Sequence, residues 1–266
     1  MSLNELTLDQ WRSADLPTAH RLAQQAADLV EGRVVSVDTV EHLGAPLHRV
    51  RIDRAGTEFA LIPGGPVILG FDLDHWSPTP EQTADYAAST EEGYGYGLED
   101  LRGYLAAVLS PHRTATVATV LMAVENEALS ELPAEMPAVL AGRGLRMPSP
   151  DEWEHACGAG AGTLFRWGDD CPLDRIPYGD PTGPHNALSA LGLHIAYDTY
   201  TTELSSDVTA VHGGDGGESA CGGYGNLLGW LPLATANRNP FTAEFVHGPE
   251  GESICDSFST RPVLPL

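Results

Sequence analysis

The residues with the clearest capacity for chemistry lie in a glycine-rich segment, residues 213–226, which contains a single thiol, Cys221. Successive glycines can turn several peptide N–H groups toward one point and form an anion-binding nest. A thiol placed there would be stabilised as the thiolate. The alternative is structural: tight glycine turns in a packed core, with Cys221 as a small buried hydrophobe. The candidate ligand-binding residues are polar side chains of this segment and one later arginine: Asp215, Ser219, Tyr224, Asn226 and Arg238.

His212 adjoins this segment and is the candidate catalytic partner of Cys221, while His185 is a second candidate base or metal ligand. With ten histidines in the chain, chance proximity is the alternative. The remaining cysteines form no C-x-x-C pair, and we expect core positions for them: Cys157, Cys171 and Cys255. The absence of a G-x-S-x-G elbow, a Walker loop and an H-E-x-x-H helix removes the commoner enzyme classes.

The elements that must position these residues begin with a helix, predicted over about residues 16–30 from its apolar periodicity. Three short runs rich in β-branched residues follow and predict an antiparallel meander: 33–40, 46–52 and 58–62. Residues 76–110 are predicted to form a mostly helical excursion, 114–124 a half-buried strand, and 127–141 a helical stretch with internal prolines.

The strongest local signal is Ser149-Pro150-Asp151-Glu152. Serine can cap a helix, proline suits the first helical position, and Glu152 can reach back to the cap, so a short helix is predicted through Ala156. Beyond Gly158 the chain is rich in glycine, proline and aspartate, with few regular elements. So much irregular chain predicts a site built from loops or a metal-stapled fold.

The chain has 266 residues with 37 acidic and 14 basic side chains, giving a formal net charge of −23, and every basic residue is arginine. Such a surface repels phosphate backbones and anionic lipid headgroups, so we expect neither nucleic acid nor membranes as partners. No apolar run approaches the roughly 18 residues that span a bilayer. Residues 1–6 lack a basic region followed by an apolar stretch, so we expect a cytoplasmic protein.

Several segments keep a recognisable order along the chain: 59–65 (Phe-Ala-Leu-Ile-Pro-Gly-Gly) with Leu69-Gly70, 145–154 (Leu-Arg-Met-Pro-Ser-Pro-Asp-Glu-Trp-Glu), 164–169, 191–193, and the late arginines Arg238 and Arg261. They resemble the F-x-x-I-P-G-G, R-L-P-T-E-A-E-W-E, P-W-G, f-G-L, A-x-R and G-F-R motifs of the formylglycine-generating enzyme (sulfatase-modifying factor) family. The resemblance implies an α+β fold of C-type-lectin-like type, low in regular structure. Residues 1–57 would form an N-terminal helix and meander packed on a main domain, residues 58–266, with the helical insertion at about 76–110.

In active enzymes of that family, two cysteines five residues apart bind copper and activate oxygen, because soft sulfur ligands select monovalent copper. If Gly216-Gly217 matches the family's glycine pair, Cys221 takes the first cysteine position and Asn226 the second. If Gly213-Gly214 matches instead, neither cysteine is present. One thiolate is a poor copper site, so the resemblance predicts loss of copper-dependent formylglycine generation, with copper or iron less expected than calcium.

Calcium is the expected metal because family members are often stabilised by it. The family's G-N-x-W-E-W calcium-binding turn is replaced here by residues 198–203, in which Glu203 matches the calcium glutamate only with a one-residue shift. Oxygen ligands remain abundant nearby, and the candidates are Asp198, Glu203 and Asp207, with Asn186 for a further site. Solvated surface carboxylates are the alternative.

Two hypotheses for function follow. The first is a divergent, non-classical member of the family whose loop-rich half binds a small molecule or a protein partner. The second is a metal-, oxygen- or thiol-dependent oxidoreductase that modifies a peptide or metabolite with Cys221 at its centre.

Overall fold

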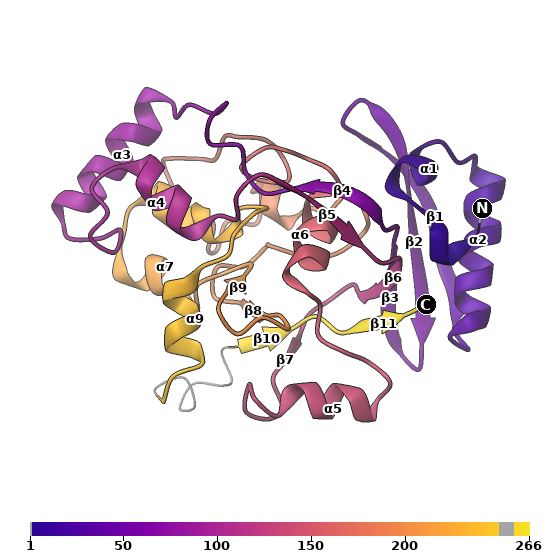
Figure 1. Cartoon of the computed structure of the whole chain (residues 1–266). Coiled ribbons are helices and arrows are strands. Elements are labelled where there is room, and N and C mark those ends of the chain that lie inside the picture. Colours follow the sequence, from indigo (N-terminus) through magenta and orange to yellow (C-terminus); the bar gives the residue numbers. More distant parts are fainter. Residues whose placement is uncertain (1, 250–257) are drawn as a thin grey trace.

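The computed structural model describes residues 2–249 and 258–266, and it begins with a short 3-10 helix, Leu3–Glu5, and helix α1, Leu8–Arg12. Helix α2, Leu16–Leu29, follows where a helix is predicted. Its start is fixed by Asp15, whose carboxylate accepts a hydrogen bond from the Thr18 N–H. A small-residue face of α2 packs against strands β1 and β2 (Figure 1).

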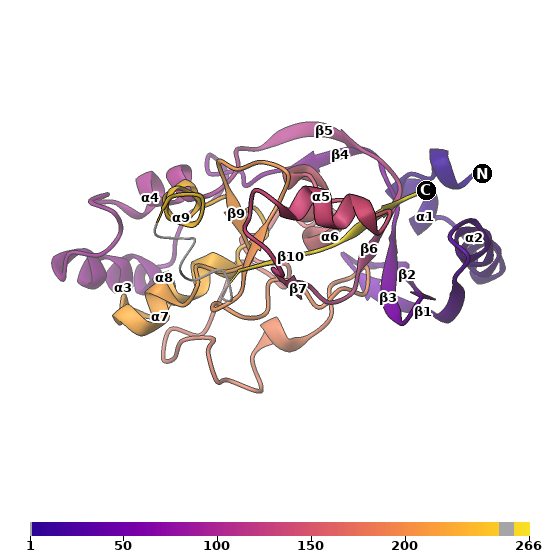
Figure 2. The same ribbon diagram turned by 90° about the horizontal axis from the view of Figure 1, so that it is seen from below.

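Strands β1, Arg33–His42, β2, Ala45–Arg54, and β3, Thr57–Ile62, pair antiparallel in sequence order, which confirms the predicted meander. The sheet continues through β6, Val120–Ala123, to β11, Val263–Pro265, again antiparallel. Residues 1–57 thus contribute two strands to a sheet that residues 58–266 complete. This sheet and α2 lie at one end of the molecule, opposite the helices α3, α7 and α9 (Figures 1 and 2).

Two smaller sheets complete the α+β architecture. Strand β4, Gly65–Leu69, pairs with β5, Arg113–Val117, and a four-stranded sheet has the order β7-β10-β8-β9. Its strands are very short: β7, Glu127–Ala128; β8, Thr202–Leu204; β9, Val211–His212; β10, Phe258–Thr260. The pairing of β10 with β8 is parallel, and the other two pairings are antiparallel.

The predicted strand over 114–124 is divided into β5 and β6. Between them, the Thr119 hydroxyl accepts from the Gly64 N–H and donates to the Leu6 carbonyl, which anchors the chain as it passes from one sheet to the next. The predicted helical stretch 127–141 is also shorter than expected. Helix α5 covers only Met136–Gly142, because Pro133 and Pro137 fit the approach and first turn of a helix but not its interior.

The helical excursion contains α3, Pro80–Glu91, and α4, Leu101–Val108. Helix α6, Pro150–Gly158, is the predicted capped helix: Glu152 N–H donates to the Ser149 hydroxyl, and the Glu152 carboxylate accepts from the Ser149 N–H. Beyond it come α7, Glu218–Gly222, α8, Asn226–Trp230, α9, Pro240–Val246, and two 3-10 turns, Pro184–Asn186 and Leu231–Leu233. None of the described helices is long and apolar enough to cross a bilayer.

The interior contains a buried ion pair between Arg261 and Glu203. The Arg261 side chain is fully buried, and it donates to both Glu203 carboxylate oxygens at 2.6 and 3.0 Å. Its remaining N–H groups donate to the carbonyls of Ala123, Val124 and His194. The Trp153 indole N–H of α6 also donates to Glu203, at 2.8 Å.

Removal of the Arg261 guanidinium alone should therefore destabilise the folded protein. We expect Arg261→Met to lower the free energy of unfolding in urea by about 3–5 kcal/mol, because it leaves Glu203 charged and unpaired in the interior. The double variant Arg261→Met/Glu203→Gln should recover part of this loss, since an amide at position 203 can still accept from Trp153. Arg143→Met is the matched control, because its pair with Glu127 is half-exposed and such pairs contribute only about 0–1 kcal/mol. Equal losses in Arg261→Met and Arg143→Met would contradict the assignment.

Candidate functional site

The glycine-rich segment forms a tight turn that leads into α7. Gly217 has φ +83, and a Cβ there would lie 2.4 Å from the Tyr200 ring, so only glycine fits. The predicted nest is closed by the protein itself: the N–H groups of Gly217 and Ser219 donate to the Asp215 carboxylate at 2.9 and 3.0 Å. Asp215 therefore acts as the acceptor that organises this turn. Burial raises the pKa of Asp215 and outweighs the hydrogen bonds with Ser219 and Gly217, which lower it.

Cys221 lies on α7 and is exposed. Its sulfur is 3.0 Å from the Tyr200 hydroxyl, and this contact, followed by burial, raises the pKa of Tyr200 to about 12. The described cysteines are all free thiols, with Cys157 buried; Cys255 lies outside the described residues. Asn226, at the second cysteine position of the family, donates its amide to the Leu173 carbonyl at 2.7 Å.

His212 lies in the core rather than beside the exposed thiol. Its ring stacks on Trp153 with centroids 4.9 Å apart, and its Nδ1 lies 2.7 Å from the Asn237 carbonyl oxygen. Burial lowers the pKa of His212 to about 4, so the ring is neutral at physiological pH. Such a histidine can position a neighbour but cannot exchange protons with solvent directly.

The four calcium candidates do not form one group. Both oxygens of Glu203 are engaged by Arg261, and Asp207 caps a local turn by accepting from the Thr209 N–H and hydroxyl. Asp198 and Asn186 do share one pocket, which His185 also lines. Within residues 2–249 and 258–266, no set of three or more His, Cys, Asp or Glu side chains is arranged to hold a metal ion.

The remaining candidates take part in local contacts. Arg238 pairs with Asp151 of α6 at 2.6 Å, while Ser219 is buried with its hydroxyl unpartnered among the described residues. Tyr224 donates to Glu218 at 2.9 Å and stacks on Tyr94 of the helical excursion, 4.1 Å between centroids. The excursion therefore contacts the glycine-rich segment directly.

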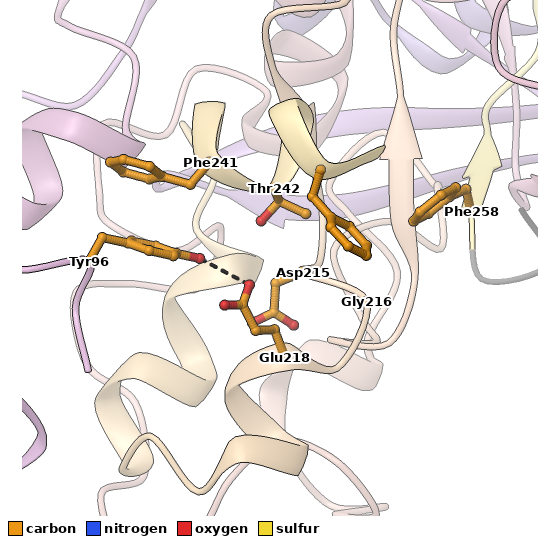
Figure 3. Close-up of a pocket in the computed structure, with 8 residues that line it drawn as sticks. Tyr96, Asp215, Gly216, Glu218, Phe241, Thr242 and Phe258 are labelled. Carbon is orange, nitrogen blue, oxygen red and sulfur yellow. Dashed lines mark hydrogen bonds between the residues drawn. The ribbon is translucent and has the colours of Figure 1, made fainter. Parts of the chain in front are cut away.

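A pocket of about 410 Å³ lies between this segment and α9. It combines four aromatic rings with two carboxylates, and its lining is Tyr96, Phe241, Phe245, Phe258, Asp215, Glu218, Gly216 and Thr242. Tyr96 and Phe241 lie on one side and Phe258 on the other, with Asp215 and Glu218 between them (Figure 3). Thr242 lies across the pocket from the two carboxylates, as the same figure shows.

Glu218 is fixed in the pocket by two phenols. The Tyr96 hydroxyl donates to one carboxylate oxygen at 3.1 Å, and the Tyr224 hydroxyl donates to the other at 2.9 Å. The Tyr96 ring stacks on Phe241 at 4.2 Å between centroids. Burial, reinforced by the Glu218 carboxylate, raises the pKa of Tyr96 to about 12, so it remains a hydrogen-bond donor at physiological pH.

Of these lining residues, sequence reasoning identified only Asp215. The signal it missed is on α9, where Phe241 and Phe245 stand four residues apart and are both exposed, at 36% and 42%. Apolar residues at that spacing share one helix face, and an exposed aromatic pair beside a glycine-rich turn is typical of a binding surface.

The buried state of His212 predicts a pH effect on stability. The folded pKa of His212, about 4, lies below the ordinary value of 6.5, so the unfolded chain takes up the proton first. This contribution to stability is complete above pH 6.5 and is lost as the pH falls toward 4, by up to about 3 kcal/mol. Urea titrations across this range should show a flatter profile for His212→Asn, whose amide can still donate to Asn237. Parallel profiles for both proteins would contradict the assignment.

A scan against models of protein families found no match for the chain, and a search of curated proteins found none either.

Proposed function

We propose that the protein is a divergent, non-classical member of the formylglycine-generating enzyme family that acts as a ligand- or protein-binding module of C-type-lectin-like fold. Binding is centred on the pocket between α9 and the turn at Asp215. The observation that carries this proposal is the pocket itself, in which aromatic walls and two fixed carboxylates meet in one cavity of about 410 Å³.

The contacts between the family-like segments support the family assignment. Trp153, in the segment that resembles R-L-P-T-E-A-E-W-E, shares the Glu203 carboxylate with the late arginine Arg261. The other late arginine, Arg238, pairs with Asp151 of the same segment. Residues far apart in the chain thus meet in one core, as motifs that specify a common fold would.

The surroundings of Cys221 favour binding over copper chemistry. Its polar neighbour is the Tyr200 hydroxyl, and the amide of Asn226 is engaged by a backbone carbonyl. Monovalent copper favours two or more soft sulfur ligands, whereas a phenol and an amide are poor substitutes.

The alternative is an enzyme that uses Cys221 as its reactive group. The exposed sulfur, 3.0 Å from the Tyr200 hydroxyl, favours it, because an exposed thiol is accessible to a substrate.

A turnover assay separates the two functions. With copper and oxygen supplied, we expect no conversion of a cysteine-containing peptide to formylglycine, and no stoichiometric copper or iron in the purified protein by elemental analysis. Cys221→Ser provides the matched control. Turnover or bound metal that disappears in Cys221→Ser would establish the enzyme and refute the binding role.

A fragment screen tests the binding role directly. Ligand-observed NMR with a library of cationic, neutral and anionic fragments should give hits that Phe241→Ala/Phe245→Ala weakens about tenfold or more, because truncation of two rings removes much of the wall. Leu29→Ala is the control, since this exposed apolar side chain lies on α2, at the opposite end of the molecule (Figure 1). A library without hits, or hits that survive the double variant, would refute a binding site in this pocket.

A further inference from the structure

The charge of the pocket is the first indication of what it binds. Asp215 and Glu218 both line it, and none of its lining residues, all within the described part of the chain, carries a positive charge. Asp215 is only 7% exposed. Two neighbouring carboxylates in a partly buried cavity repel one another, and a bound cation would relieve that repulsion. The net charge of −23 acts in the same direction by attracting cations to the surface.

The hydrogen bonds of the two carboxylates narrow the kind of cation. Each Asp215 oxygen accepts from a backbone N–H, and each Glu218 oxygen accepts from a tyrosine hydroxyl. Each carboxylate oxygen therefore already has one donor from the protein, and about half of the acceptor positions are occupied. An alkylated ammonium needs none of the remaining positions, because it interacts through its charge alone.

The aromatic walls favour an organic cation over a metal ion. Calcium takes six to eight oxygen ligands, and the rings of Phe241, Phe245 and Phe258 provide none. Aromatic rings attract diffuse cations through their quadrupoles, and the attraction is strongest where water is displaced. The methyl groups of an alkylated ammonium also bury apolar surface against these rings.

The geometry points to a compact alkylated ammonium, of the trimethylammonium class, as the ligand of this pocket. The inference rests on the proposed function and specifies its ligand class. The cation lies between the two carboxylates and the aromatic walls. The cation belongs either to a free small molecule or to a methylated lysine side chain of a peptide.

Isosteric probes test this assignment on the intact protein. Isothermal titration calorimetry with choline, its neutral isostere 3,3-dimethylbutanol and the anion 3,3-dimethylbutanoate should rank them in that order. We expect choline to bind about tenfold more tightly than the neutral alcohol, and the anion not to bind. Ethanolamine, which has the same length but three N–H donors, should bind more weakly than choline.

Variants assign the effect to the pocket. Glu218→Gln should weaken choline binding about tenfold and leave the neutral alcohol unaffected, because it removes charge and little shape. Glu244→Gln is the matched control, since this exposed carboxylate lies on α9 outside the pocket lining. Choline and acetyl-trimethyllysine amide distinguish the two sources, since the tighter binder identifies the natural one.

Three results would overturn the inference. Equal affinity for choline and the neutral alcohol, abolished by Phe241→Ala/Phe245→Ala, would remove the charge argument and leave the binding function intact. Ethanolamine binding as tightly as choline would refute the alkylated class. The absence of binding by both choline and acetyl-trimethyllysine amide would refute the ligand class altogether, and the fragment screen would then decide separately whether the pocket binds ligands at all.

Discussion

The buried ion pair of Arg261 and Glu203 is the constraint on which the C-terminal half depends. All five N–H donors of Arg261 are used, two on Glu203 and three on the carbonyls of Ala123, Val124 and His194. These partners belong to separate strands and loops. Backbone hydrogen bonds between strands would join them only weakly, because β8 and β10 contain three residues each. A buried charge pair is costly to desolvate, and full hydrogen-bond satisfaction is what makes this one tolerable.

The same pair places the walls of the pocket. Phe258 opens β10, three residues before Arg261, and β10 runs parallel to β8, which contains Glu203. From β8 the chain turns through β9, which pairs with β8, and enters the glycine-rich segment that contains Asp215. The position of Asp215 therefore depends on the strand that holds Glu203. Phe241 and Phe245 come from α9, which packs on β9. Three separate parts of the chain therefore meet at one cavity, and two of them, β10 and the segment that follows β8, adjoin the Arg261–Glu203 pair.

The sequence predicted correctly those elements that depend on interactions between residues close together in the chain. The Ser149 capping box, the apolar face of α2 and the meander of β1, β2 and β3 are written in a few consecutive residues, and each is present. The prediction of one strand over 114–124 was wrong because a contact remote in sequence, Thr119 with Gly64 and Leu6, divides it. Among the residues that line the pocket, Asp215 was predicted and Tyr96 was not. Tyr96 belongs to the helical excursion, more than 100 residues before Glu218 in the chain, and only the folded structure brings its hydroxyl within 3.1 Å of the Glu218 carboxylate.

Asp215 both organises the glycine-rich turn and lines the pocket. Its carboxylate must be ionised to accept the Gly217 and Ser219 N–H groups well, yet burial and the nearby Glu218 raise its pKa and oppose ionisation. The hydrogen bonds of the turn therefore offset only part of the free-energy cost of burying the charged Asp215 carboxylate. In the proposed binding role, a cation in the pocket would offset the rest of this cost, and the unfavourable ionisation of Asp215 would then contribute to affinity. Cys221, three residues beyond Glu218 on α7, is exposed and does not line the pocket, so the proposed binding role rests on the carboxylates and not on the thiol.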